Sequence, residues 1–262
     1  MQIRPGIEIA NLTDPGCVRT VNEDYYCFVE PESDELFRRR GRLMVVADGM
    51  GGHVGGQVAS GIAVDSLRNV FLNSAAEDPI DLLIEGFSLA QRSILERSAQ
   101  SPELRGMGTT CTAAIVHHGH LIYGHIGDSR LYLIRRGHPS QVTEDHSLVN
   151  RLVRSGAITP EQAAVHQDRN VLTAALGMPS NEMAADFSDR PIPLEPGDGL
   201  VLASDGLHGL VNPDEIREAV EKESSYEACR TMVDLARLRG GPDNITVQIL
   251  RILPEFFNGA SR

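Results

Sequence analysis

Two hydrophobic periodicities alternate along the chain. Short apolar runs rich in β-branched residues are typical of buried strands. The predicted strands are 25–29, 43–47, 110–117, 121–126, 131–135, 200–203 and 245–252. Between several of these runs, apolar residues instead recur at the spacing of an amphipathic helix. The predicted helices are 55–73, 79–99, 213–222 and 225–239.

The order of these elements favours an α+β fold. Two predicted helices follow one another over 55–99, strands follow one another over 110–136, and two helices precede the last strand. Strict alternation of strand and helix would indicate a doubly wound parallel sheet. Runs of strands beside runs of helices favour antiparallel sheets with helices packed outside. We expect a single domain over 1–262, because no repeat, low-complexity tract or proline-rich linker divides the chain.

Two segments lack both periodicities. Residues 31–42 (PESDELFRRRGR) are dominated by charge, and we interpret them as a solvated loop between two strands. Residues 145–185 contain short, polar, helix-like pieces that Gly156 and Pro160 interrupt. A core would rarely tolerate charged side chains such as Arg151 in this segment. We therefore predict a small helical flap over about 145–185.

Composition and charge exclude several classes of protein. Hydrophobic residues make up 41% of the chain and charged residues 23%, which are ordinary values for a globular protein. No apolar run approaches the roughly 20 residues of a membrane span, and the N-terminus lacks a signal-peptide core. We therefore expect a soluble, cytoplasmic protein. The net charge of −12 argues against a nucleic-acid partner, because such proteins normally present a basic surface.

Lysine and cysteine narrow the chemistry further. The single lysine, Lys222, lies in a polar run and does not follow a glycine-rich turn, which excludes a phosphate-binding P-loop. It is also a poor candidate for Schiff-base chemistry. The four cysteines are scattered without a C-x-x-C pair, so they match neither a zinc site nor a disulfide framework.

Aspartates recur at the ends of the apolar strands. Asp48, Asp128 and Asp205 each follow such a run and precede a small residue, and Asp243 stands directly before the last strand. Converging carboxylates at strand ends are costly unless a positive charge compensates them, and hard divalent cations provide that charge. For any single Asp-Gly pair a turn is the simpler interpretation, and we interpret Asp198 in the run EPGDG as one. The recurrence at several strand ends favours a metal site.

Six short motifs follow one another along nearly the whole chain, from about residue 6 to 252. They are Arg19-x-x-Asn22-Glu23-Asp24, Asp48-Gly49-Met50-Gly51-Gly52-His53, Gly108-Thr109-Thr110, Gly127-Asp128-Ser129-Arg130, Ser204-Asp205-Gly206 and Asp243-Asn244. In this order they resemble the metal-dependent protein phosphatases, the PPM or type 2C serine/threonine phosphatases, in their bacterial form. The resemblance implies a central sandwich of two antiparallel β-sheets flanked by α-helices on both outer faces, with a variable helical flap.

The resemblance also implies a centre of two or three Mn²⁺ or Mg²⁺ ions. Asp48 would bridge two ions, one of which the Gly49 carbonyl would also ligate. Asp205 and Asp243 would ligate the other ion, and Asp128 with Asp205 would form a third metal site. A hydroxide shared by two ions would then attack phosphorus directly, without a phosphoenzyme intermediate.

Residues around that centre would serve the substrate and proton transfer. By the same resemblance, Glu23 and Asp24 hold metal-bound waters, and Arg19 grips the substrate phosphate with its planar guanidinium. Eukaryotic members carry a histidine directly after the Asp-Gly pair, whereas this chain has Met50 there and His53 three residues later. Either His53 or a metal-bound water would protonate the leaving alkoxide, and we favour the water. The other histidines are expected to be structural or surface residues.

The expected partners are phosphorylated proteins and a cognate bacterial serine/threonine kinase whose action the enzyme opposes, and the expected state is a monomer. A catalytically inactive phosphatase-fold module is one alternative, but every metal aspartate is present. A dinucleotide-binding enzyme is another, with residues 48–53 as the phosphate loop. There the G-x-G-x-x-G spacing fails at Val54. Loss of activity on adding a chelator would separate a phosphatase from both.

Overall fold

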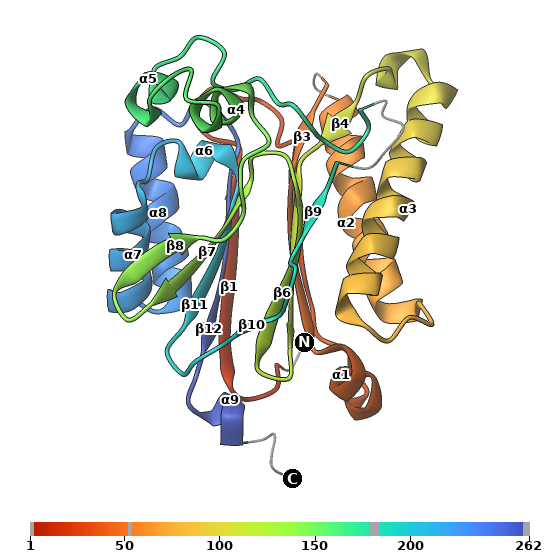
Figure 1. The fold of residues 1–262 in the computed structure, drawn as a ribbon, viewed down its shortest axis with the longest axis vertical. Coiled ribbons are helices and arrows are strands. Elements are labelled where there is room, and N and C mark those ends of the chain that lie inside the picture. The colour runs from red at the N-terminus through yellow and green to blue at the C-terminus, as the bar shows by residue number, and fades with distance from the viewer. Residues whose placement is uncertain (1–2, 52–53, 179–183, 259–262) are drawn as a thin grey trace.

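Two antiparallel β-sheets stand face to face in the computed structural model, which describes residues 3–51, 54–178 and 184–258 (Figure 1). Within these ranges the smaller sheet has the strand order β1-β12-β11-β7-β8. Its strands are β1 (Ile7–Asp14), β7 (Arg130–Arg135), β8 (His138–Gln141), β11 (Gly199–Ala203) and β12 (Ile245–Ile252).

The larger sheet has the order β10-β6-β5-β3-β2, with β4 paired to β3 and β9 paired to β6. Its strands are β2 (Asp24–Val29), β3 (Arg42–Met50), β4 (Gly108–Thr109), β5 (Cys111–His117), β6 (His120–Ile126), β9 (Asp186–Phe187) and β10 (Ile192–Pro193). The predicted strands all form, and the register is antiparallel, as the α+β interpretation requires.

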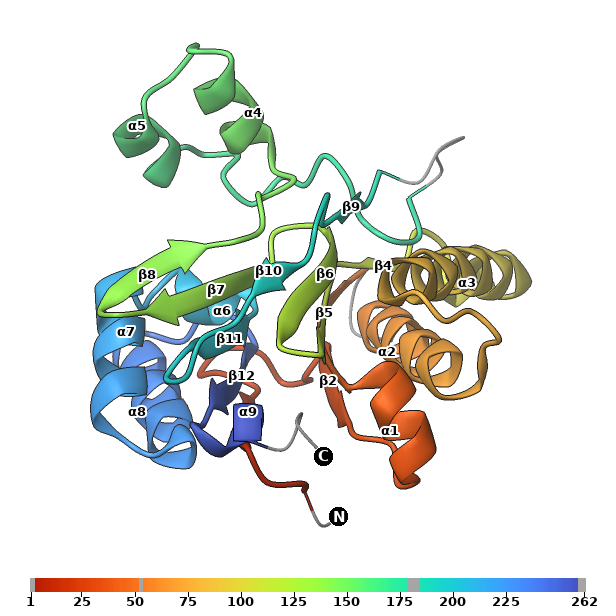
Figure 2. The same ribbon diagram turned by 60° about the horizontal axis from the view of Figure 1, so that its bottom comes forward.

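Helices cover the outer face of each sheet, as Figures 1 and 2 show. The larger sheet is covered by α2 (Gly55–Asn73) and α3 (Pro79–Gln100), and the smaller sheet by α7 (Pro213–Lys222) and α8 (Ser225–Leu238). Local sequence explains where α7 begins: the Asn212 side chain accepts from the Glu215 backbone N–H at 3.0 Å in a capping box, and Pro213 follows the cap. The predicted four-layer arrangement is confirmed.

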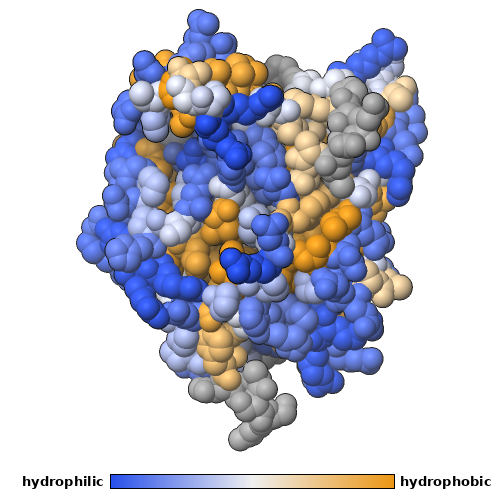
Figure 3. All heavy atoms as spheres, in the orientation of Figure 1, coloured by the Kyte–Doolittle hydropathy of each residue, from blue (hydrophilic) through white to orange (hydrophobic). Residues whose placement is uncertain are grey.

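The core consists of apolar layers on both faces of each sheet. In β3, Leu43 and Val45 pack beneath α2, whereas Met44 and Val46 face the other sheet. Successive side chains of a strand point to opposite faces, so a strand buried on both faces shows an unbroken apolar run. The space-filling view shows hydrophobic residues gathered over the middle of one face and hydrophilic helix surfaces on either side (Figure 3).

A short helix, α1 (Asp34–Arg40), lies where the sequence predicted a solvated loop over 31–42. That prediction is wrong because the charges are ordered along a helix axis. Ser33 caps the first turn, acidic residues occupy that turn, and arginines occupy the last. Gly41 ends the helix with φ +70°, a conformation that glycine adopts readily.

The segment after β8 forms the short helices α4 (Leu148–Arg154) and α5 (Pro160–Ala164), as the flap prediction expected. We call residues 145–178 and 184–185 the flap. The remaining short elements are η1 (Pro102–Leu104), α6 (Asp205–His208) and α9 (Glu255–Asn258). Among the residues that the structure describes, no helix is both long enough and apolar enough to cross a membrane.

Candidate metal centre

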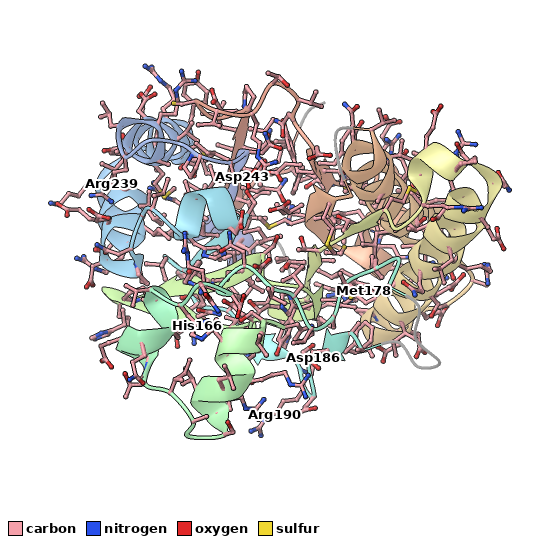
Figure 4. All side chains as sticks on the ribbon, turned by 90° about the horizontal axis from the view of Figure 1, so that it is seen from above. His166, Met178, Asp186, Arg190, Arg239 and Asp243 are labelled. Carbon is pink, nitrogen blue, oxygen red and sulfur yellow. The ribbon has the colours of Figure 1, made fainter. Side chains whose placement is uncertain are left out.

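Carboxylates from both sheets gather at one end of the sandwich, which we call the mouth. Asp24 begins β2 and lies directly opposite Asp48 of β3 in the antiparallel register. From the smaller sheet come Asp128 before β7, Asp205 at the start of α6, and Asp243 just before β12. Figure 4 looks down on this end, with Asp243 on the side of α8 and Asp186 on the side of the flap.

The Asp-Gly pairs at the mouth are not tight turns. Gly49 continues strand β3, and a Cβ there would lie 2.2 Å from the Gly56 carbonyl oxygen. Gly206 lies in α6, where a Cβ would come within 2.0 Å of the Asn244 carbonyl oxygen. Neither glycine has a positive φ. These glycines are required because backbones meet closely beside the carboxylates, which removes the turn as an explanation for Asp48 and Asp205.

Buried oxygen atoms at the mouth lack hydrogen-bond partners within the described residues. They are Glu23 Oε1, Asp24 Oδ1 and Asp205 Oδ1. The second oxygen of Asp24 does have a partner, because the Ser204 hydroxyl donates to Asp24 Oδ2 at 2.8 Å. Buried polar atoms in proteins are almost always paired, so unpaired carboxylate oxygens indicate a missing positive partner.

Burial and mutual repulsion raise the pKa values of these carboxyl groups. Burial raises the pKa of Asp24 to about 7, and the charges of Asp205 and Asp243 add to this. Burial followed by the neighbouring carboxylates places the pKa of Asp48 well above its ordinary value. The pKa of Asp128 is raised to about 7 by burial and then by the charge of Asp205. Like charges held this close oppose ionisation unless cations join them.

The residues at the mouth match the requirements of hard divalent cations. Their free atoms are carboxylate oxygens, the ligands that Mg²⁺ and Mn²⁺ prefer. Among the described residues, no group of three or more His, Cys, Asp or Glu side chains is arranged so that it could hold a metal ion. Ions of this type commonly keep several waters and take one or two protein carboxylates. The mouth therefore suits hydrated Mg²⁺ or Mn²⁺ better than a zinc-like site.

Arg19 contacts one of the predicted metal ligands directly. Its Nη2 atom lies 2.7 Å from Asp243 Oδ2, and this contact raises the pKa of Arg19. The Arg19 side chain is 48% exposed and that of Asp243 is 33% exposed, so the pair lies at the rim of the mouth. The guanidinium predicted to grip phosphate therefore lies beside the carboxylates, where it can meet an anion that approaches them.

Backbone contacts hold the ligand segments in place. The Asp48 carbonyl accepts from the Thr110 N–H and the Thr109 hydroxyl, both at 2.9 Å. Asn244 accepts from the Glu23 N–H at 2.8 Å and donates to the carbonyl of Val21 at 3.0 Å. These contacts assign positioning roles to threonines and an asparagine that the sequence motifs contained without a defined function.

His53 lies outside the described residues, so its proposed role in proton transfer stays a prediction.

Arg130, to which the sequence assigned no catalytic role, forms an ion pair with Asp145 at 2.7 Å. This pair lowers the pKa of Asp145 against the effect of its burial. A pocket of about 310 Å³ lies beside it, lined from the flap and β9 by residues including Asp145, Asn150, Arg151, Arg154 and Asp186.

The family model for protein phosphatase 2C matches residues 20–238 of the chain. The chain belongs to the protein phosphatase 2C family. Protein phosphatase PhpP of Streptococcus pneumoniae is 37% identical over 254 residues, which span 95% of this chain and 99% of that protein. Serine/threonine protein phosphatase PstP of Mycobacterium tuberculosis is 34% identical over 247 residues, or 94% of this chain and 45% of that longer protein.

Solved structures of protein phosphatase 2C relatives share the fold. The serine/threonine phosphatase of S. agalactiae has a TM-score of 0.85 and 34% identity, covering 94% of this chain and 99% of that chain. The catalytic domain of PstP in complex with 2 manganese ions has a TM-score of 0.80 and 33% identity, covering 95% and 99%. The chain is a metal-dependent serine/threonine protein phosphatase that uses Mn²⁺ or Mg²⁺, as its motifs predicted.

Proposed function

We propose that the mouth carboxylates are the metal ligands of this phosphatase. Asp48 and the Gly49 carbonyl would hold one ion, and Asp128 with Asp205 would take a third. The second ion would have to draw Asp48, Asp205 and Asp243 together, because no three such side chains among the described residues already form a group that could hold an ion. Glu23 and Asp24 orient the waters around the ions. The observation that carries this proposal is the set of buried carboxylate oxygens without hydrogen-bond partners in the described residues.

Bound divalent cations would lower the pKa of a coordinated water and neutralise phosphate oxygens during attack on phosphorus. The protein's own residues would do the rest. Arg19 binds two phosphate oxygens with its planar fork and orients the ester. The Ser204 hydroxyl, fixed by the Thr246 N–H at 2.9 Å, keeps Asp24 from rotating away from the mouth.

The flap is proposed to contact the protein part of the substrate. Residues 1–262 then act as one domain whose flap borders the mouth. Two flap features support contact with a polypeptide: the charged pocket, and the apolar side chain of Val165, which is 82% exposed. Arg151 lines the pocket and has no ion-pair partner within the described residues, so an acidic group of a substrate can meet it there.

The biological setting is proposed to be opposition to a bacterial serine/threonine kinase, with the enzyme acting as a cytoplasmic monomer. The relatives PhpP and PstP carry the names of bacterial protein phosphatases, which supports a phosphoprotein substrate. Four free cysteines suit a reducing compartment. A monomer is the simplest state for a site whose proposed ligands all come from one chain.

A phosphopeptide assay with and without Mn²⁺ tests the proposed centre. Hydrolysis of phosphoserine or phosphothreonine peptides is expected with Mn²⁺ and none after chelation. Asp205→Asn and Asp243→Asn should raise the Mn²⁺ concentration needed for half-maximal activity, whereas Asp214→Asn, on the exposed start of α7, should not. Robust turnover in excess EDTA would overturn the proposal.

A further inference from the structure

The turn between β6 and β7, residues Gly127–Ser129, presents Asp128 to the mouth. On the opposite side the turn contacts Thr110 and Thr112 closely. Gly127 has φ +105°, and a Cβ there would lie 2.5 Å from the Thr110 Cβ. The Ser129 hydroxyl bonds to the Thr110 hydroxyl at 2.7 Å, and the Ser129 carbonyl accepts from Thr112 Oγ1 at 2.8 Å. These contacts fix the rear of the turn and leave the backbone groups of Gly127 and Asp128 to other partners.

His208 holds the turn from the side of the smaller sheet. Its Nε2 lies 2.9 Å from the Asp128 carbonyl oxygen. A carbonyl can only accept, so Nε2 carries the hydrogen and donates. His208 ends α6, the one-turn helix that Asp205 begins. A single turn of helix therefore carries both the Asp205 carboxylate and the group that fixes Asp128 beside it.

His146 holds the same turn from the flap. Its backbone N–H donates to the Gly127 carbonyl at 2.7 Å, and the Gly127 N–H donates to His146 Nδ1 at 3.3 Å. Because Nδ1 accepts, the ring hydrogen sits on Nε2, which donates to Asp186 Oδ2 at 3.1 Å. The imidazole thus joins the turn to β9. The backbone carbonyl of His146 also accepts from the Thr173 backbone N–H, at the far end of the flap, at 2.8 Å.

We propose that His208 and His146 are positioning residues that clamp the Gly127–Ser129 turn and keep the Asp128 carboxylate beside that of Asp205 as a pair of cation ligands. The proposal rests on the cation role proposed above for Asp128. Two carboxylates at close range repel one another, and the turn would relieve that repulsion by moving Asp128 outward. Residues that orient metal ligands through hydrogen bonds change metal affinity by roughly 10- to 100-fold.

Two substitutions at His208 distinguish a role of its Nε2–H hydrogen bond from a role in packing alone. In His208→Gln, the side-chain amide can place an N–H near the position of Nε2. His208→Leu fills similar space without a donor. A role in packing alone would treat the two variants alike, whereas a clamp requires the donor and predicts rescue by glutamine.

Mn²⁺ titration followed by electron paramagnetic resonance, which counts free and bound ions without turnover, tests the clamp. Relative to wild type, Asp128→Asn and His208→Leu should both weaken the weakest Mn²⁺ site by roughly 10-fold or more, whereas His208→Gln should retain it. Loss of the site in Asp128→Asn but not in His208→Leu would overturn the clamp and leave the cation site. Equal losses in both His208 variants would also overturn the clamp. Unchanged Mn²⁺ binding in Asp128→Asn would instead overturn the role of Asp128 as a cation ligand. The proposal that the clamp positions Asp128 for a cation would then fail as well.

The flap side of the clamp gives an independent test if His208→Leu fails to fold. In His146→Asn, the side-chain oxygen can accept from the Gly127 N–H, and in His146→Leu it cannot. Mn²⁺ binding should be weakened only in the leucine variant. Nitrogen-15 spectra of the metal-free protein should also show a ring hydrogen on Nε2, and none on Nδ1, of both imidazoles. An Nδ1–H form of His208 or His146 would contradict the donor and acceptor assignments on which the clamp depends.

Discussion

Strands β2 and β11 each have a carboxylate at or near both ends, and the hydrogen-bond partners of these carboxylates differ between the two ends. At the end away from the mouth, which we call the base, Glu30 accepts from Arg42 Nε at 2.6 Å and Asp198 accepts from Arg135 Nη2 at 2.6 Å. At the mouth, Asp24 and Asp205 each keep a buried oxygen without a partner in the described residues. Carboxylates on the same two strands are paired with arginine at the base, whereas at the mouth each keeps one buried oxygen without a partner in the described residues.

This difference indicates that the carboxylates at the base stabilise the fold, whereas those at the mouth are available for function. A buried carboxylate paired with arginine is neutralised within the protein, and Glu30 and Arg42 are almost fully buried together. Carboxylates without such partners destabilise the folded chain and remain available to external cations. The Asp-Gly pair at 198 confirms the contrast, because there the Asp198 N–H donates to the Glu195 carbonyl at 3.1 Å in the turn that the sequence predicted.

The largest effect is expected from Asp48→Asn at the mouth. This change removes the charge proposed to bridge two ions while keeping the side-chain shape. A loss of several kcal/mol of transition-state stabilisation corresponds to a fall in turnover of about three orders of magnitude. Steady-state kinetics with saturating Mn²⁺ measures it, and circular dichroism checks the fold. Asp198→Asn at the base is the matched control, with turnover near wild type. Retention of a tenth of the activity by Asp48→Asn would show that Asp48 is not the bridging ligand.

At the base, Glu30→Gln should lower stability without lowering turnover per folded molecule. It leaves the buried Arg42 guanidinium, whose pKa burial already lowers, without its counter-charge. Breaking a buried pair from one side costs about 3–5 kcal/mol in the free energy of unfolding. Urea denaturation measures this. Asp34→Asn removes a far more exposed partner of Arg4, 80% exposed, and should leave the urea midpoint nearly unchanged. Equal costs for the two variants would contradict the distinction between buried and exposed pairs.

The mouth should also make the metal-free protein less stable as the pH rises from about 5 to about 7.5. The pKa values of Asp24 and Asp128, ordinarily 3.8, are each raised to about 7. Between those values the folded chain binds more protons than the unfolded chain, so stability falls as the pH rises through about 7. Urea midpoints in EDTA at about pH 5 and 7.5 should show this fall, and Asp128→Asn should reduce it. Added Mn²⁺ should abolish it, because bound cations stabilise the ionised carboxylates. A midpoint that rises with pH in EDTA would contradict the unpaired state of the mouth.

The smallest effects are expected in the flap, whose charges are exposed rather than buried. Charge reversal at Arg151, Arg154 or Arg169 should change rates on phosphopeptides by roughly 2- to 5-fold, the scale of an exposed ion pair. A small aryl phosphate should be hydrolysed at nearly the wild-type rate, since it does not reach the flap. Parallel kinetics on both substrates measures the difference. Equal losses on the two would mean that the flap supports the fold or the metal centre instead.

The sequence predicted the fold best where burial is complete. Helix α2 has the predicted bounds, and β3 shows an unbroken apolar run over 43–47 because both of its faces are covered. Strand β1 was missed because it is an edge strand and mostly half-buried, so its pattern is mixed. Strands β9 and β10 are too short for any period to appear.

The aspartates of the site could be predicted, but their contacts could not. Strand ends and motif order indicate which carboxylates converge. The contact between Arg19 and Asp243 joins residues 224 positions apart and depends on how two loops approach. His208 and His146 were expected to have no functional role. The one available signal was the spacing of His208 in the run SDGLH, which places it one helical turn after Asp205.

The position of β12 sets when during synthesis the smaller sheet can be completed. β12 is the last strand in sequence, yet it lies between β1 and β11, where it pairs with the first strand of the chain. Until β12 leaves the ribosome, β1 has no neighbour in its sheet, and Asp243 and Asn244 are absent from the mouth. Pairings of such long sequence separation are slow to form because a long loop must close first. A nascent chain can therefore fold its helical hairpin α2–α3 early, whereas the proposed ligand Asp243 reaches the mouth only when β12 has been inserted.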